Sequence, residues 1–236
     1  MITLYGMSSP NVSKIAIMLE ETGLIYETRH VDLPAGEQFT SEFLAASPNN
    51  KVPYIVDHAA GISLGESGAI LIYLAEKTSQ YLPQDVRARA HTLYWLMVQL
   101  TSIGPNFGQL VHFTRRAPEG QEYSTARFAT EMRRCLRVLE TRLADHAFLA
   151  GAYSIADMAT YPWIKTITSF VPANVRPDLA EYPSLQRWFT AIAQRPAVIS
   201  AQKAVDELQK FDIAAFTQAT PEQLDKFSGR GPNARV

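Results

Sequence analysis

The stretch that decides the fold is SPNNKVPYIV, residues 47–56. It opens with turn-forming residues, and an apolar, β-compatible run follows them. Pro53 stands at the start of this run, where an inner strand normally excludes proline because proline donates no ladder hydrogen bond. A cis Val52–Pro53 bond would remove the conflict by leaving the Val52 N–H and C=O turned outward, free to bind an extended peptide as a further strand would. A trans proline on an edge strand is the alternative.

The elements on either side of this stretch favour the cis form, because their order is that of a thioredoxin-type layer. A short apolar strand is predicted over 2–5, and Gly6 ends it before residues 8–11, whose hydroxyl and amide side chains suit a helix N-cap. Apolar residues at three- and four-residue steps then predict an amphipathic helix that ends at Gly23. The remaining elements are a strand over 26–33, a short helix over 37–46, strands over 52–56 and 62–64, and a helix over 67–77.

The second half of the chain is predicted to be all-helical. Helical patterns cover 85–104, 124–145, 155–169 and 183–195, and Gly104–Pro105 should end or kink the first of them. With residues 81–84 as linker, we expect a thioredoxin-like domain over 1–80, an all-helical domain over 86–210 and a C-terminal extension over 211–236. Residues 229–232 lack helical periodicity, so the extension either wraps over the surface or is disordered.

Composition excludes several classes of function. Of the 236 residues, 47% are hydrophobic and 19% are charged, and the formal net charge of -1 is far from the basic balance of a nucleic-acid binder. The N-terminus lacks a basic segment followed by an apolar run, and no stretch reaches the ~18 apolar residues that span a bilayer, which predicts a cytoplasmic protein with no membrane partner. The single cysteine, Cys135, allows no internal disulfide and no CxxC pair. Any reacting thiol is therefore expected to come from outside the chain.

Several longer motifs resemble the glutathione transferase superfamily over nearly the whole chain. They are residues 47–53, 65–74, 153–157 and 182–185, with Trp188 and the pair Arg195–Pro196. Finer features at 9–11, 36–39, 49–51 and 108–113 are similar to the nu-class and related disulfide-bond reductases. The resemblance implies a thioredoxin-like N-terminal domain, a helical C-terminal domain, a homodimer, and glutathione as co-substrate. Leu93, Leu96 and Leu100 fit a dimer face or, equally, an internal core.

The same resemblance implies a glutathione site in the first domain. Glu66 would pair with the γ-glutamyl ammonium, and Ser67, at a helix N-terminus, would present its hydroxyl and N–H to the carboxylate, with a plain helix cap as the alternative. Lys51 and Gln38 would lie near the glycyl carboxylate, although singly each would more often be a solvated surface residue. Val52 and Pro53 would contact glutathione through the backbone.

The reacting thiol of glutathione is expected over Ser9 and Asn11, at the positive end of the first helix. A helix N-terminus and one or two hydrogen-bond donors lower a thiol pKa, and the thiolate is the nucleophile. Ser8, Ser9 or Asn11 acting merely as a helix cap is the alternative, and both roles can coexist. Related reductases often have threonine where Ser9 stands, and serine lacks the β-branching that restricts a rotamer. Tyr5 is similar to the activating tyrosine of other classes, but we interpret it as a structural strand residue.

Further residues are expected outside the first domain. Arg127 is similar to the arginine that related reductases contribute from the other subunit, with an exposed surface charge as the alternative. His112 and Phe113 are assigned to a second-substrate cleft, together with Phe107, Tyr161 and Trp163, although ordinary helical core is the alternative for the aromatic residues. Residues 154–157 have the spacing of a capping box, and the resemblance identifies them as the folding box of the helical domain.

No metal site is predicted, since His58 and His146 have no partners at metal-ligand spacing, and Cys135 in a periodic helix is interpreted as a packed small residue.

The function implied by the resemblance is a glutathione-dependent disulfide-bond oxidoreductase that uses the thiolate of bound glutathione on a small disulfide. A conventional glutathione S-transferase or peroxidase acting on electrophiles or organic peroxides is one alternative. A non-catalytic glutathione-binding regulator is another. A cysteine-dependent thiol transferase is opposed by the lack of a cysteine near the first helix.

Overall fold

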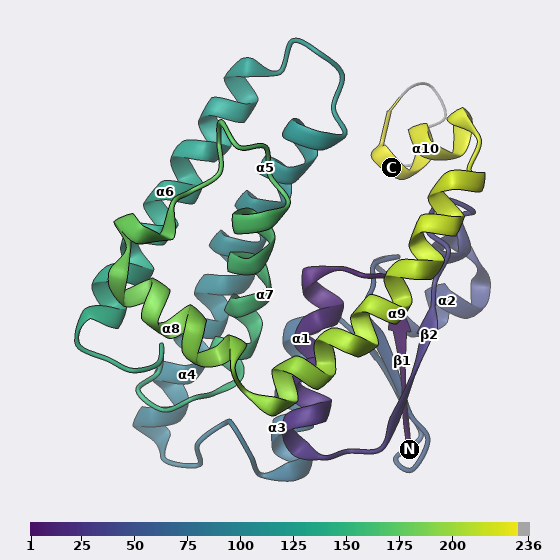
Figure 1. Cartoon of the computed structure of the whole chain (residues 1–236). Coiled ribbons are helices and arrows are strands. Elements are labelled where there is room, and N and C mark those ends of the chain that lie inside the picture. Colours follow the sequence, from purple (N-terminus) through teal and green to yellow (C-terminus); the bar gives the residue numbers. More distant parts are fainter. Residues whose placement is uncertain (231–236) are drawn as a thin grey trace. The chain divides into compact units, whose positions relative to one another are not determined.

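The structure of the chain is a computed structural model that describes residues 1–230 (Figure 1). By its internal contacts the chain divides into two compact units, one made of residues 1–74 together with 196–230 and the other of residues 75–195. Among the described residues, all named strands belong to the first unit. The first unit therefore combines the N-terminal sheet with a helix from the far end of the chain.

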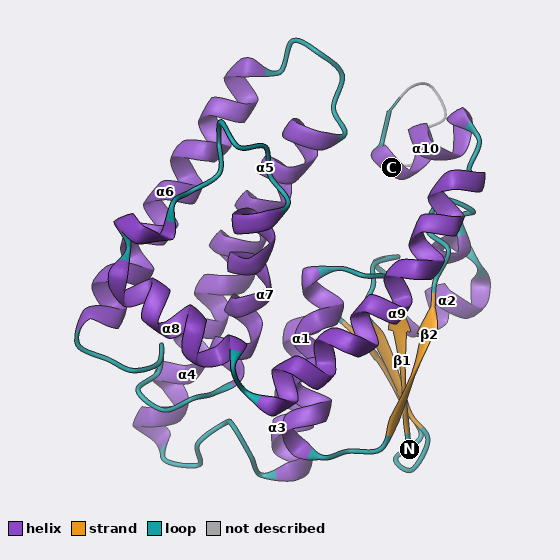
Figure 2. Cartoon of the chain, viewed as in Figure 1, coloured by secondary structure: helices purple, strands orange, loops and turns teal. Residues whose placement is uncertain are grey.

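The strands of the first unit, orange in Figure 2, form one mixed sheet. It has four strands in the order β2-β1-β3-β4. The strands are β1 Ile2–Gly6, β2 Tyr26–His30, β3 Tyr54–Asp57 and β4 Ile62–Gly65. β1 pairs in parallel with β2 and antiparallel with β3, and β3 pairs antiparallel with β4. The thioredoxin-like order expected from the sequence is confirmed.

Local capping chemistry sets the limits of α1, Pro10–Thr22. Ser9 is its N-cap, Pro10 opens the first turn, and Gly23 ends it in the left-handed conformation at φ 66°. The buried face of the helix includes the predicted Val12, Ile15, Met18 and Leu19. The other elements of this layer are a 3₁₀ turn, η1 Glu37–Phe39, and the helices α2 Ser41–Ala46 and α3 Ser67–Thr78.

Helix α9, Pro196–Gln218, belongs to the first unit although it lies far along the chain. It runs beside α1 and contacts β2 (Figure 1). A further short helix, α10 Pro221–Ser228, opens with a capping box between Thr220 and Gln223. The extension expected from residue 211 is thus helical over most of its described length, and the limit at 210 falls inside α9. Gly231 and Pro232 lie outside the described residues, and the expected domain limits stay a prediction.

The second unit is helical, as expected. Its helices are α4 Val86–Val98, α5 Gly104–Arg115, α6 Glu122–Ala144, α7 Ile155–Ser169 and α8 Pro183–Ala193, with a 3₁₀ turn η3 Leu179–Glu181. Between α4 and α5 lies a π-helical turn, η2 Gln99–Ile103. Pro105 lacks a backbone N–H, so the regular helical ladder cannot pass through it. The helix was expected to end or kink at Gly104–Pro105; the structure instead has the π-helical turn directly before these residues, and α5 continues from them. No sequence pattern predicted α5.

Each unit has its own apolar core. Fully buried residues include Leu4, Ile15 and Ile55 in the first unit, and Leu139 and Met158 in the second. Within residues 1–230, no helix is both long and apolar enough to cross a membrane.

Candidate functional site

Strand register brings three site segments to one end of the sheet. Tyr5 in β1 pairs with Tyr54 at the start of β3, and Tyr54 pairs with Gly65 at the end of β4. The chain after β1, the chain before β3 and the chain after β4 therefore emerge side by side. Those three segments carry residues 9–11, 51–53 and 66–67, so the sheet itself gathers most of the residues predicted in the first domain.

The corner between β1 and α1 holds Ser9 and Asn11, both partly exposed. The Ser9 hydroxyl accepts a hydrogen bond from the Val12 N–H at 3.3 Å, which is N-cap geometry. A hydroxyl that accepts a cap bond still has its own hydrogen to donate. Ser9 thus does cap α1, and this role leaves its hydroxyl able to donate to a ligand.

The Val52–Pro53 peptide bond before β3 is cis, as predicted. Beside it, Ser47 is buried and donates its hydroxyl to the Lys51 carbonyl at 2.9 Å, while the Lys51 side chain is exposed. This bond holds residues 47–51 in a compact loop, which orders the backbone on which Lys51 and Val52 sit.

Gln38 lies in the 3₁₀ turn η1 and is buried, not solvated. Its Nε2 donates to the Leu33 carbonyl at 3.2 Å, and its Oε1 is buried with no hydrogen-bond partner among residues 1–230. The Nε2 group has a second hydrogen, so the amide can still donate to an anionic ligand. The surface alternative for Gln38 is therefore wrong, because the side chain is built into the turn.

The turn between β4 and α3 carries Glu66 and Ser67. Glu66 has a φ of 63°, in the left-handed region that costs a residue with a side chain on the order of 1 kcal/mol. Its carboxylate accepts a hydrogen bond from Asn49 Nδ2 at 2.9 Å, while Ser67 is buried at the first turn of α3. Acid, hydroxyl and helix N-terminus thus stand together, which suits the ammonium and carboxylate of one amino-acid headgroup.

Lys14 is a residue of this region that sequence reasoning missed. It is buried on α1 with 1% of its surface exposed, and its Nζ donates to Ser67 Oγ at 3.2 Å. Burial lowers the pKa of the Lys14 ammonium to about 7, and the charge of Glu66 opposes part of that fall. The sequence did contain a signal for its burial: residues 15–19 are all apolar, so α1 has no fully polar face on which Lys14 could lie in solvent.

Helix α9 holds the loop before Ser9 through Asp212. This carboxylate is 6% exposed and accepts from the Ser8 N–H at 2.8 Å and from the Ser8 hydroxyl. Its other oxygen lies 2.8 Å from His30 Nε2 at the end of β2. Asp212 thus ties α9, β2 and the loop before α1 together.

The other predicted site residues belong to the second unit. Arg127 is exposed on α6 and pairs with Glu131 at 3.1 Å, and hydrogen bonds from Arg134 and Arg127 keep the pKa of Glu131 low. His112 and Phe113 lie on α5, where Phe113 stacks on Phe128 with ring centroids 5.5 Å apart. Phe107 is fully buried, whereas Tyr161 and Trp163 are 6% and 8% exposed, so core packing accounts for most of their surface.

Ser154 and Asp157 form the expected capping box at the start of α7. Asp157 also accepts from the Leu149 N–H at 2.9 Å and from Trp188 Nε1 at 2.8 Å. Burial raises its pKa to about 6, and the four donors that face it oppose the rise.

Cys135 is buried, which raises the pKa of its thiol and fits the expected packed residue.

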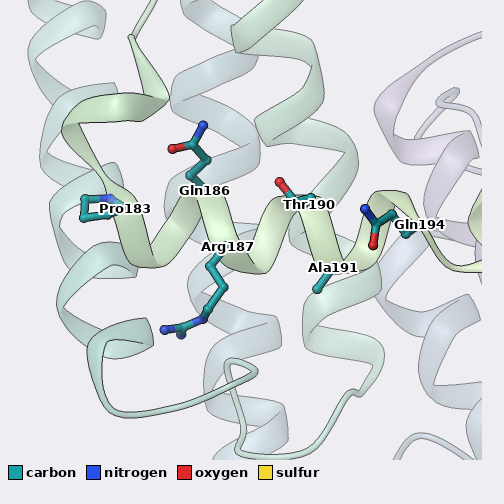
Figure 3. A pocket seen from close by; sticks show the side chains of 6 residues that line it. All are labelled: Pro183, Gln186, Arg187, Thr190, Ala191 and Gln194. Carbon is teal, nitrogen blue, oxygen red and sulfur yellow. The ribbon is translucent and has the colours of Figure 1, made fainter.

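A surface pocket elsewhere is lined by α8 and by Gln194, the residue that follows it (Figure 3). It contains none of the predicted site residues; its lining is Pro183, Gln186, Arg187, Thr190, Ala191 and Gln194. The Arg187 guanidinium is held by the carbonyls of Leu143 and His146. Over the described part of the chain, no group of three His, Cys, Asp or Glu residues could hold a metal ion.

Comparison with known proteins places both halves of the chain in one family. The glutathione S-transferase N-terminal domain model matches residues 1–76, and the C-terminal domain model matches residues 96–196. The Escherichia coli disulfide-bond oxidoreductase YfcG is 46% identical over 84% of this chain and 92% of its own. The E. coli disulfide-bond oxidoreductase YghU is 39% identical over 84% of this chain and 72% of its own.

Two solved structures are similar in sequence and in fold. A glutathione transferase from Burkholderia graminis, with two glutathione molecules bound per subunit, is 42% identical with a TM-score of 0.79, and 87% of each chain is covered. A glutathione transferase from Pseudomonas putida, with one glutathione disulfide per subunit, is 39% identical with a TM-score of 0.79. That match covers 86% of this chain and 90% of the other.

Proposed function

Because the chain belongs to the glutathione S-transferase family, we propose that it is a glutathione-dependent disulfide-bond oxidoreductase that uses the thiolate of bound glutathione. The observation that carries this proposal is the corner at the start of α1. Ser9 and Asn11 stand at the positive end of that helix, while the only cysteine of the chain is buried on α6. The reacting thiol must then be supplied by glutathione.

Glutathione binds mainly at the three chain segments that meet at one end of the sheet, which carry residues 9–11, 51–53 and 66–67. Glu66 pairs with the γ-glutamyl ammonium, and Ser67 donates to the carboxylate. The backbone of Val52, beside Pro53, pairs with the cysteinyl backbone as a strand would. Lys51 and Gln38 bind the glycyl carboxylate. Arg127 of a second subunit adds a further positive charge, and His112 with Phe113 contacts the second substrate.

The reaction has two thiol–disulfide exchange steps. The thiolate of bound glutathione attacks one sulfur of a small disulfide, forms a mixed disulfide, and releases the other half as a thiolate that takes a proton from solvent. The thiolate of a second glutathione then attacks the mixed disulfide, which yields glutathione disulfide and the second thiol. Ser9 and Asn11 donate hydrogen bonds to the attacking thiolate and so lower the pKa of the bound thiol.

A test compares glutathione-dependent reduction of 2-hydroxyethyl disulfide with conjugation to chlorodinitrobenzene. We expect strong disulfide turnover, weak conjugation, and a fall in turnover of about 10- to 100-fold in Asn11→Ala, since the thiolate loses a charge-assisted hydrogen bond and less of the bound thiol is ionised. Asn174→Ala, at an exposed loop residue, is the matched control and should leave turnover unchanged. Strong conjugation with little disulfide turnover would make the protein a conventional transferase. Tight glutathione binding with no turnover would make it a regulator.

We also propose that the enzyme is a cytoplasmic homodimer. Leu96 on α4 is fully buried within the chain, but Tyr94 and Met97 on the same helix are 61% and 42% exposed. These side chains give α4 an apolar outer face that a second copy would cover. Sedimentation equilibrium should report a dimer for the wild type and a weaker one for Tyr94→Glu, whereas a monomeric wild type would contradict the proposal.

A further inference from the structure

Lys14 is a charged residue in an apolar setting. Its side chain leaves α1 among buried neighbours, and only 1% of its surface is exposed. Burying an ammonium group without compensation costs several kcal/mol. Its Nζ lies 3.2 Å from Ser67 Oγ, so this cation faces the serine that is proposed to bind the γ-glutamyl carboxylate.

Burial, opposed in part by one nearby charge, brings the pKa of Lys14 close to neutral pH. Glu66, on the turn before α3, is the charged group whose field favours the ammonium, but burial outweighs it and the pKa stands at about 7. On the α9 side of α1, the Asp212 carboxylate is already engaged by Ser8 and His30. A further negative charge arriving at Ser67 would therefore raise the pKa of Lys14 and draw a proton onto it.

The protonation state of Lys14 also determines what the Ser67 hydroxyl can do. An ammonium has three donors and no acceptor, so Ser67 Oγ must accept from it and turn its own hydrogen elsewhere. A neutral amine has a lone pair and can accept that hydrogen instead. A neutral amine can also donate to Ser67 Oγ, but its lone pair competes with a ligand carboxylate for the hydroxyl hydrogen, whereas the ammonium does not.

We propose that Lys14 is a positioning residue of the γ-glutamyl subsite, whose ammonium acts through the Ser67 hydroxyl to strengthen binding of the ligand carboxylate. This rests on the proposed function, because it takes glutathione as the ligand at Glu66 and Ser67. Binding takes up a proton from solvent, up to one per site, and leaves the Lys14 ammonium, the Ser67 hydroxyl and the carboxylate in one hydrogen-bonded chain.

The test is calorimetric titration with S-methylglutathione, which has no ionisable thiol to release a proton. Measuring the binding enthalpy in buffers of different ionisation enthalpy gives the number of protons taken up. For the wild type, at a pH slightly above the Lys14 pKa of about 7, we expect uptake of a large fraction of a proton. Affinity should fall up to about tenfold per pH unit as the pH rises further.

Lys14→Met should bind more weakly at low pH, take up no proton and lose the pH dependence, while Ser67→Ala should lose most of the uptake. Lys203→Met, at an exposed position of α9, is the matched control and should behave as the wild type. Tight binding by the wild type without proton uptake would overturn the role of Lys14, whether or not Lys14→Met folds. Failure of the wild type to bind S-methylglutathione would instead overturn the proposed function, and this inference with it.

Discussion

The carboxylate of Asp212 on α9 accepts a hydrogen bond from the Ser8 N–H at 2.8 Å, and the Ser8 hydroxyl donates to the same oxygen. Ser8 directly precedes Ser9, the N-cap of α1. A side chain from the far end of the chain therefore holds the backbone that leads into the proposed thiolate site. The contact is local to one unit, since Asp212 and Ser8 both belong to it.

Loss of this contact should affect turnover more than glutathione binding. Asp212→Ala should lower the free energy of unfolding by about 2 kcal/mol, because hydrogen bonds to a charged group are lost. It should also lower kcat for disulfide reduction, while the affinity for S-methylglutathione changes little, since Glu66 and Ser67 stay in place. Asp206→Ala, at an exposed position of the same helix, is the control. An equal loss of affinity and kcat would refute the positioning role.

The two roles of Ser9 can be separated by substitution. Ser9→Ala should lower the free energy of unfolding by about 1 kcal/mol through loss of the cap, and should raise the thiol pKa of bound glutathione. Ser9→Asp should keep the cap but raise the thiol pKa further, since a carboxylate donates no hydrogen bond and repels the thiolate. Ser9→Thr should restore both properties. The ultraviolet absorbance of the thiolate against pH reports the pKa, and an unshifted value in Ser9→Asp would leave Ser9 as a cap alone.

Glu66 combines a ligand-binding role with an unfavourable backbone conformation at φ 63°. Glu66→Gly should keep or raise the free energy of unfolding, by up to about 1 kcal/mol, because glycine adopts this conformation without strain. Glutathione affinity should fall by about tenfold or more with the loss of the charge-assisted bond. Glu66→Gln should lose the affinity without gaining stability. Denaturant unfolding measures the stability and calorimetry measures the affinity. A clear destabilisation of Glu66→Gly would show that the backbone strain at Glu66 is not significant.

Asp157 should be essential for the stability of the second unit. Asp157→Ala leaves buried donors of Leu149, Ser154 and Trp188 without their acceptor, at about 1–3 kcal/mol each. A loss of at least about 3 kcal/mol is expected in denaturant unfolding, against less than about 0.5 kcal/mol for the exposed Asp206→Ala. A small effect in Asp157→Ala would mean that water or rearrangement satisfies these donors.

The pH dependence of stability should report the buried Lys14. Its folded pKa of about 7 lies below the ordinary lysine value of 10.5, so between these values the unfolded chain binds more protons than the folded protein. Stability contributed by this group therefore rises with pH across that window, by at most about 1.4 kcal/mol per pH unit. Lys14→Met should lack this rise. Identical slopes for wild type and variant in denaturant unfolding would contradict the lowered pKa.

Much of the fold follows from local sequence signals. The apolar periodicity of α1, its cap at Ser9 and its stop at Gly23 act within a few residues, so they predict the helix without knowledge of the rest of the molecule. The capping box at Ser154 and Asp157 was predicted for the same reason, with the family resemblance to support it. The cis bond before Pro53 was predicted instead from the order of the surrounding elements, because proline statistics alone favour the trans form.

Only the tertiary structure decided which distant side chains meet. Lys14 has the sequence neighbours of an ordinary helix residue, and only the folded unit buries it and brings it to Ser67 at the start of α3. Asp212 reaches Ser8 because α9 returns to α1 after a whole helical unit intervenes. Gln38 likewise appears solvated in the sequence but is buried in its turn. Periodicity and caps are short-range signals and determined most of the elements of the first 80 residues, whereas burial and hydrogen bonding depend on contacts between remote segments, which no local pattern encodes.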